Sequence, residues 1–104
     1  MNTVTTGQLA QINDTFRQSG FGTMMTPGIQ AIEDLSDLMQ AVRSFNSFDE
    51  DNDPHGEHDF GTIVWKGMKV FWKIDYYDEA LEYWEDPLSS TCHRVLTVML
   101  AEEY

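Results

Sequence analysis

The chain has 104 residues, and its 18 Asp and Glu against 6 Lys and Arg give a formal net charge of −12. This charge disfavours direct binding to DNA or RNA and to anionic membrane surfaces, because both are themselves negatively charged. A hydrophobic share of 41% and an aromatic share of 12% are too high for a disordered acidic tail. The sequence therefore predicts one folded acidic domain over residues 1–104.

Cys92 is the single cysteine, so no disulfide bond can form within the chain. The first residues have neither the basic residue nor the apolar run of a signal peptide. No stretch contains the roughly 18 apolar residues of a membrane span. Together these features predict a cytoplasmic protein with no membrane partner.

Two helices are predicted, over residues 6–18 and 34–45. The first has an apolar stripe formed by Leu9, Ile12 and Phe16. The second repeats apolar residues with a helical period, at Leu35, Leu38, Met39, Val42 and Phe45. A brief strand is predicted within residues 21–26, between the two helices.

The most regular pattern lies in residues 62–77. Strands 62–65 and 68–77 alternate apolar and polar residues on either side of Lys66–Gly67, which suits a two-residue hairpin turn. This hairpin pairs Trp65 with Met68, Ile63 with Val70 and Gly61 with Trp72. Its predicted apolar face consists of Ile63, Trp65, Met68, Val70, Trp72 and Ile74.

A loop with one helical turn near residues 79–83 is predicted to follow, and then a strand over residues 93–101. This last strand is apolar on both faces, which is typical of the interior of a sheet. The fold class is therefore predicted as α+β. The expected architecture is an antiparallel β-sheet of three to four strands, covered on one face by the two helices.

Residues 49–59 form the first acidic segment, with six carboxylates among eleven residues. A calcium-binding loop does not fit, because Pro54 stands where Gly is needed and Phe60 where Glu is needed. His55 and His58 have an allowed metal-ligand spacing but lie in a predicted loop, and Cys92 and His93 should point to opposite faces of a strand. We expect no metal ion and no cofactor.

Residues 75–86 form the second acidic segment, with six carboxylates and the interleaved aromatic residues Tyr76, Tyr77, Tyr83 and Trp84. Such a segment is either a solvated face or an interface for an Arg-rich partner, which would form salt bridges and cation–π contacts with it. The first segment leads into the hairpin and the second leaves it, so both could lie at one end of the sheet.

Three strings resemble a family of short acidic bacterial proteins that is known only as a domain of unknown function. They are N-D-P-H-G-E-H-D-F-G at residues 52–61, F-W-K-I-D-Y-Y-D at 71–78 and R-V-L-T-V-M-L-A-E-E-Y at 94–104. The resemblance implies a shared fold and a bacterial or mobile-element origin, and no activity. The family pattern has Tyr at the position of His55, which weakens a His55–His58 metal pair.

The leading hypothesis is a small acidic protein-interaction domain, not an enzyme, that binds a basic partner. One form of it is an inhibitor that occupies a nucleic-acid-binding surface, since phage and plasmid inhibitors of CRISPR or restriction systems are often of this size and charge. The predicted partner-binding residues are Asp49, Glu50, Asp51, Asp53, Glu57, Asp59, Asp75, Tyr77, Asp78, Glu79, Glu82, Glu85 and Asp86.

The alternative hypothesis is a metal-dependent or hydrolytic enzyme centred on Glu57, His58, Asp59 and Asp75. These residues fall in the strings that resemble the family, together with Tyr76, and would be the ones to suspect if the family has a catalytic site. A homo-oligomer remains open under either hypothesis.

Overall fold

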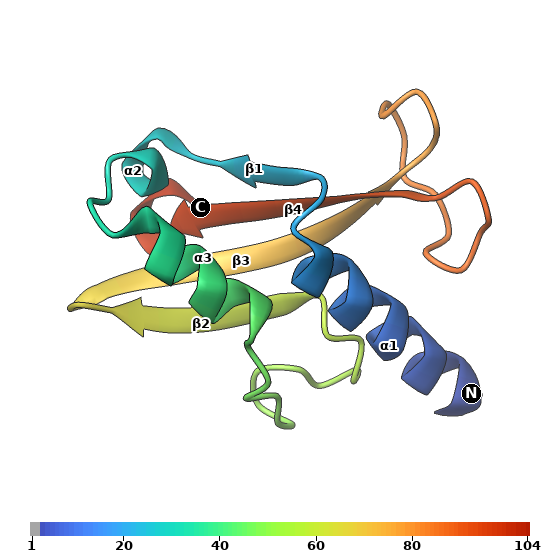
Figure 1. Ribbon diagram of the computed structural model, residues 1–104. Coiled ribbons are helices and arrows are strands. Elements are labelled where there is room, and N and C mark those ends of the chain that lie inside the picture. Colours follow the sequence, from blue (N-terminus) through green and yellow to red (C-terminus); the bar gives the residue numbers. More distant parts are fainter. Residues whose placement is uncertain (1–2) are drawn as a thin grey trace.

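The computed structural model describes residues 3–104 (Figure 1). Its elements in chain order are α1 (Thr3–Ser19), β1 (Thr23–Met25), α2 (Pro27–Gln30), α3 (Leu35–Arg43), β2 (Phe60–Trp65), β3 (Met68–Tyr77), β4 (His93–Leu100) and the 3-10 helix η1 (Ala101–Glu103). The α+β class is confirmed. Long loops connect α3 to β2 and β3 to β4; the first contains the first acidic segment, and the second contains the second acidic segment from Asp78 onward.

The four strands form one sheet in the order β1-β4-β3-β2. The β2–β3 hairpin has the predicted register, with Trp65 opposite Met68 and Gly61 opposite Trp72. Lys66 and Gly67 both have positive φ, of 50° and 84°, as a tight hairpin turn of this kind requires. The cross-strand pairing read from the alternation is therefore confirmed.

The sheet is mixed, and the expectation of a purely antiparallel sheet needs this correction. β3 pairs antiparallel with β2 and β4, but β1 pairs parallel with β4, with Met24 opposite Thr97. The chain passes through two helices and the hairpin between β1 and β4, and it returns in the same direction. As predicted, β4 is an interior strand, flanked by β1 and β3.

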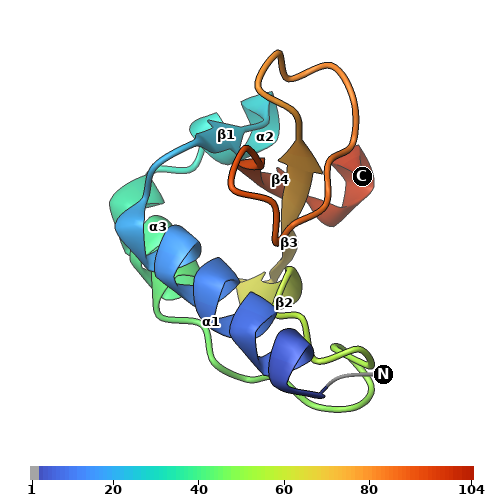
Figure 2. The ribbon, with the colours of Figure 1, turned by 90° about the vertical axis from the view of Figure 1, so that its right-hand side faces the viewer.

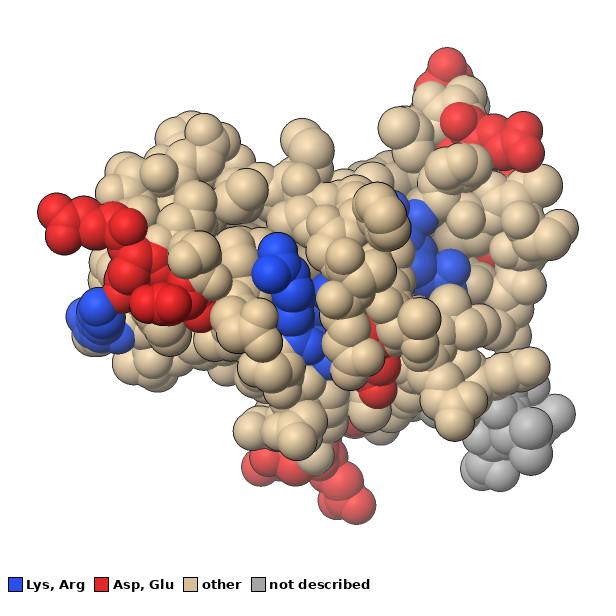
Figure 3. Space-filling model, viewed as in Figure 1, with Lys and Arg blue, Asp and Glu red and all other residues tan. Residues whose placement is uncertain are grey.

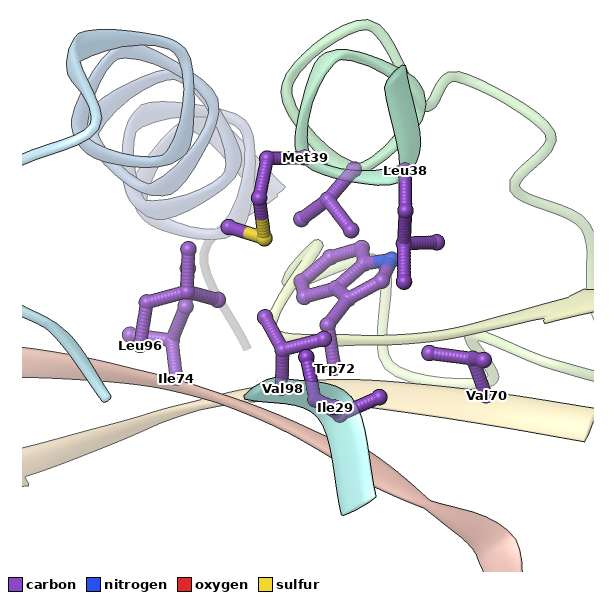
Figure 4. Packing of buried hydrophobic residues seen from close by; sticks show 9 residues of the cluster. Ile29, Leu38, Met39, Val70, Trp72, Ile74, Leu96 and Val98 are labelled. Atoms are coloured by element: carbon purple, nitrogen blue, oxygen red, sulfur yellow. The ribbon is translucent and has the colours of Figure 1, made fainter. Parts of the chain in front are cut away.

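One face of the sheet carries the core. Figure 2 shows α1 and α3 on the same side of the sheet. In the close-up view of Figure 4, the side chains of Leu38 and Met39 on α3 point toward Trp72, Leu96 and Val98 on the strands. The predicted cover of two helices over one face is thus confirmed, and Trp72 at its centre is fully buried.

The face of the sheet opposite to α1 and α3 is less covered by other parts of the chain. Strand alternation places Phe60 and Phe71 on that face. Tyr104, which follows η1, packs against both rings, with centroid distances of 6.4 Å to Phe60 and 5.6 Å to Phe71.

The Glu103 carboxylate accepts hydrogen bonds from Thr26 Oγ1 at 2.6 Å and from the Gly28 and Leu100 amides at 3.0 Å. These contacts join the residues after β4 to the turn before α2.

Two local expectations are wrong. The inner face of α1 contains Leu9, Ala10, Asn13 and Arg17, whereas the predicted stripe residue Ile12 is 38% exposed. The polar members of this inner face are buried with hydrogen-bond partners from other segments: Asn13 bonds the loop after α3 and strands β3 and β4, and Arg17 bonds α3 and the start of that loop. The helical turn expected near residues 79–83 is absent, and turns and bends occupy this region instead.

Candidate functional site

A cluster of polar side chains lies between α1 and the sheet; it consists of Asn13, Asp14, Arg17, Asp53, His58, Asp59, Tyr76 and Arg94. We call it the polar cluster. Among the residues whose burial the structure describes, Asn13 and Arg17 are the fully buried polar or charged side chains. Buried polar groups must find partners, so the cluster shows how α1 is fixed to the rest of the fold.

Asn13 connects three segments that are far apart in the sequence. Its Nδ2 donates to the Glu57 carbonyl at 2.9 Å and to the Tyr76 hydroxyl at 2.8 Å. Its Oδ1 accepts from Arg94 Nε at 2.7 Å. One amide side chain thereby links α1 to the loop before β2, to β3 and to β4.

Tyr76 and Asp59 form the next link of the cluster. The Tyr76 hydroxyl donates to Asp59 Oδ2 at 3.2 Å. Burial is the main cause that raises the pKa of both groups, and the hydrogen bond from Tyr76 partly opposes the rise for Asp59. The cluster therefore favours the neutral form of each group relative to water.

His58 lies between two carboxylates. Its Nδ1 is 3.0 Å from both carboxylate oxygens of Asp14, and its Nε2 is 3.6 Å from Asp53 Oδ2. The imidazole stacks on the Phe48 ring, with 3.8 Å between centroids and 6° between planes. Both ring nitrogens and one ring face thus have partners within the fold.

Arg17 continues this arrangement beneath α3. Its Nε and Nη2 donate to the Val42 and Phe45 carbonyls at 3.0 and 2.8 Å, and its Nη1 pairs with Asp14 at 3.1 Å. The guanidinium also lies over the Trp72 ring, 4.7 Å from its centroid. Arg17 thus binds one carbonyl in the last turn of α3 and one just after the helix, and it joins α3 to α1.

The structure brings together three of the four residues of the enzymatic alternative. His58 and Asp59 belong to the polar cluster, and Glu57 precedes them and contributes its backbone carbonyl to Asn13. Burial is the main cause that raises the pKa of Glu57. Asp75 lies on the other face of the sheet and pairs with Lys73 at 3.0 Å. Across residues 3–104, no three His, Cys, Asp or Glu side chains are placed to share one metal ion.

The first acidic segment divides into an inner and an outer part. Asp53 accepts hydrogen bonds from the Glu57 and His58 amides, and its side chain is only 7% exposed. Asp59 also faces inward. Asp49, Glu50 and Asp51 are exposed. Glu57 is partly buried, so Asp49, Glu50 and Asp51 are the most accessible of the predicted partner-binding residues in this segment.

The second acidic segment is more exposed. Asp78 accepts from the Glu82 amide at 3.0 Å, and its own amide donates to the Tyr83 carbonyl at 2.8 Å. The side chains of Tyr83 and Trp84 are 71% and 70% exposed. Glu79, Glu82 and Asp86 are exposed, whereas Tyr77 and Glu85 are partly buried.

The Glu85 carboxylate accepts hydrogen bonds from the Ser89 and Thr91 hydroxyls. Hydrogen bonds of the Asp78 and Glu85 side chains within the β3–β4 loop therefore stabilise the conformation of this segment.

The acidic side chains do not form one continuous surface in the view of Figure 3. One group covers the end of the β3–β4 loop at the upper right, and another lies below, over the loop that leads into β2. A third group lies near the α2–α3 connection, at the left of Figure 3. Asp34, in this connection, pairs with Lys66. The prediction of a shared end of the sheet overlooked this third group, although Glu33, Asp34 and Asp37 are visible in the sequence.

Sequence reasoning also missed Asn13, Asp14, Arg17 and Arg94 as members of a site. A signal was present for α1, because Asn13 and Arg17 follow Leu9 at intervals of four residues and so share its face. Their partners outside α1 could not be identified, since they lie 25 to 81 positions away along the chain.

In residues 3–104, no helix is both long enough and apolar enough to span a membrane. A search of curated proteins and one of solved structures each gave no match. A family model matches residues 25–103, which include β2, β3, β4, the last residue of β1 and both acidic segments. The chain therefore belongs to the family described as protein of unknown function (DUF3768), in agreement with the resemblance of its three strings to an uncharacterised family.

Proposed function

We propose that the protein is an interaction domain that binds a basic surface of a partner protein through residues 78–86, here called the acidic loop. The observation that carries this proposal is the combination of exposed carboxylates with the exposed rings of Tyr83 and Trp84. Exposed aromatic side chains beside charges are typical of the residues that dominate binding energy at protein interfaces.

The ordered backbone of the acidic loop supports the proposal. Asp78 makes two hydrogen bonds within the loop, and a β-bridge joins Tyr77 to Trp84. Figure 1 shows the β3–β4 loop projecting beyond the sheet. A projecting loop that is already ordered loses less conformational entropy on binding than a flexible one.

The chemistry of the loop favours a partner rich in Arg. Carboxylates pair with guanidinium groups, and aromatic rings accept cation–π contacts from them. Protein surfaces that hold nucleic acid offer this chemistry, so the finer proposal is an inhibitor that occupies such a surface. The exposed Asp49, Glu50 and Asp51 add to the long-range attraction, whereas Asp53 and Asp59 serve the fold.

The test is a pull-down from a bacterial lysate with the immobilised chain, read by quantitative mass spectrometry. The loop variant combines Glu79→Gln, Glu82→Gln and Asp86→Asn. A matched control combines Glu33→Gln, Asp37→Asn and Glu102→Gln, three exposed acids outside the loop. Both variants remove the same number of charges, so a difference between them reflects position and not net charge.

We expect a basic nucleic-acid-binding protein to be retained by the wild type and by the control, lost with the loop variant, and displaced by added duplex DNA. Equal retention by both variants would contradict a role of the acidic loop. Retention that survives an excess of DNA would contradict the finer proposal of an inhibitor while leaving the interaction domain in place.

A further inference from the structure

A groove of about 740 Å³ lies between α1 and the start of β4. Ile12 and Phe16 of α1 and Phe21 of the following turn form its apolar walls, and Cys92 and Arg94 contribute from the other side. Phe21 is 77% exposed, so it lies at the rim of the groove. The volume is within the range of sites that hold small organic molecules.

Arg94 is held rigidly beside these apolar walls. Its Nε donates to Asn13 at 2.7 Å and its Nη2 to the Pro87 carbonyl at 2.6 Å, and the guanidinium lies 5.3 Å from the centre of the Tyr76 ring. Its Nη1 has one weak contact, to Cys92 Sγ at 3.8 Å. The side chain is thus fixed, with donor capacity left at Nη1.

The charge of Arg94 is not neutralised within the described part of the chain. Arg17, Lys66 and Lys73 each pair with a carboxylate, whereas no described carboxylate lies within 4.0 Å of Arg94. This is unusual for a fixed, partly buried guanidinium in a chain of net charge −12. Partly buried charges are normally paired.

Two nearby carboxylates limit what the groove can accept. Burial raises the pKa of the Cys92 thiol; Arg94 opposes that rise, and Glu85 and Asp86 add to it. The Glu85 carboxylate accepts a hydrogen bond from Thr91, the neighbour of Cys92, and Asp86 precedes Pro87, whose carbonyl accepts from Arg94, so both acids lie close to residues of the groove. A ligand with one negative charge placed on Arg94 is favoured over a dianion such as a phosphate monoester, because repulsion from Glu85 and Asp86 grows with ligand charge.

We infer that this groove binds a small amphipathic monocarboxylate, with the carboxylate on Arg94 and an aromatic or aliphatic body against Ile12, Phe16 and Phe21. A charge-assisted hydrogen bond to a guanidinium is stronger than one between neutral groups. Because hydrogen bonds already fix Arg94, little side-chain freedom is lost on binding. This inference does not rest on the proposed function, because residues 78–86 do not line the groove and its test uses no variant of the acidic loop.

The test uses 4-phenylbutyrate as the probe, with 4-phenylbutan-1-ol and 3-phenylpropyl phosphate as comparators. Binding to the full chain is followed by amide chemical shifts in NMR titrations. We expect 4-phenylbutyrate to bind saturably with a Kd below about 1 mM and to shift the amide signals of residues 12–22 and 92–94. The Kd of the alcohol should be about tenfold higher. The phosphate should also bind more weakly than the carboxylate.

Variants separate the two parts of the site. Arg94→Gln should remove the preference for the carboxylate over the alcohol. Phe21→Ser, at an exposed position, should weaken both probes by a similar factor, and Val64→Ser, exposed on β2, should change neither. The affinities of the wild-type protein for the carboxylate and the alcohol can be compared without any variant. This comparison therefore tests the inference even if Arg94→Gln does not fold. Equal affinity for the two probes, or no saturable shift in the groove, would overturn the inference.

Discussion

Gly61 on β2 lies against the indole ring of Trp72 on β3, and a Cβ added to Gly61 would fall 2.3 Å from Trp72 Nε1 and 2.5 Å from Cε2. The two residues are directly opposite in the sheet. The absence of a side chain at residue 61 is therefore what leaves room for the largest buried side chain of the core.

Gly61→Ala should destabilise the fold, because the added methyl group must displace a fully buried ring. Overpacking of this kind typically costs about 1–3 kcal/mol in the free energy of unfolding. Urea unfolding measures the change. Gly7→Ala is the matched control: no atom lies within 4 Å of its added Cβ in α1, so it should stabilise by about 0.5–1 kcal/mol. Equal midpoints for Gly61→Ala and wild type would contradict the Gly61–Trp72 contact.

Trp72→Ala should lower the free energy of unfolding by about 3–5 kcal/mol, which is enough to unfold many small domains. Trp84→Ala removes an identical side chain from an exposed position and should change stability by less than about 0.5 kcal/mol. Thermal unfolding of the two variants compares a core Trp with a loop Trp. Similar melting temperatures would show that the face assignment of β3 is wrong.

Asn13→Ala should cost about 1–3 kcal/mol or more, because it removes the hydrogen bonds of Asn13 to the Glu57 carbonyl, the Tyr76 hydroxyl and Arg94 Nε. Gln8→Ala, exposed on the same helix, serves as the control and should have little effect. Hydrogen exchange provides a second readout. Faster exchange in residues 53–59 of the Asn13 variant is expected, and unchanged exchange there would argue against the linking role of Asn13.

Asp59 and Glu103 should give pH dependences of opposite sign. Burial raises the pKa of Asp59 above its usual 3.8, so the folded state binds more protons than the unfolded state in this window. The free energy of unfolding then falls as the pH rises from about 3.8 through the raised pKa of Asp59. Asp59→Asn removes the titrating carboxyl group and so avoids this decrease. The free energy of unfolding of the variant, relative to that of the wild type, should therefore increase as the pH rises from about 3.8 through the raised pKa of Asp59.

Glu103 behaves in the reverse way. Hydrogen bonds from Thr26, and from the Leu100 and Gly28 amides, lower its pKa below the usual 4.5. Its contribution to stability is present above pH 4.5 and is lost as pH falls through the lowered value. Glu103→Gln should therefore have its largest effect at neutral pH. Parallel curves of unfolding free energy from pH 3 to 7 for both variants would contradict these assignments.

Binding kinetics should separate charge from aromatic contact in the acidic loop. Neutralising Glu79, Glu82 and Asp86 should lower the association rate with the captured partner, and added salt should do the same to the wild type. Tyr77→Ala and Trp84→Ala should mainly raise the dissociation rate. Surface plasmon resonance at two salt concentrations distinguishes these effects. Rates that are insensitive to salt would mean that the exposed carboxylates serve solubility alone.

The β2–β3 hairpin could be predicted residue by residue, since strict alternation and a central Gly67 determine which residues face each other. The helices of the core could be placed for a similar reason, because their apolar periodicity is local. Local patterns cannot tell which strand pairs with which over a long separation. The parallel pairing of β1 with β4 was missed for that reason.

The polar cluster was beyond prediction for a different reason. The sequence places His58 in a predicted loop, and nothing near it in the sequence indicates Asp14 or Phe48 as partners. Asp53 and Glu50 look alike in the sequence, yet one is nearly covered and the other is exposed. The inward turn of Asp53 depends on its hydrogen bonds to the Glu57 and His58 amides, and these form only in the folded loop.

The placement of β4 between β1 and β3 has a consequence for the order of folding. The hairpin closes over two residues, whereas β1 meets β4 only after a separation of 73 positions, from Thr23 to Leu96. Closing so long a segment is entropically costly, so the hairpin should form in the folding nucleus and β1 should dock late. Substitutions in the hairpin should then mainly slow folding, while Met25→Ala on β1 should mainly speed unfolding.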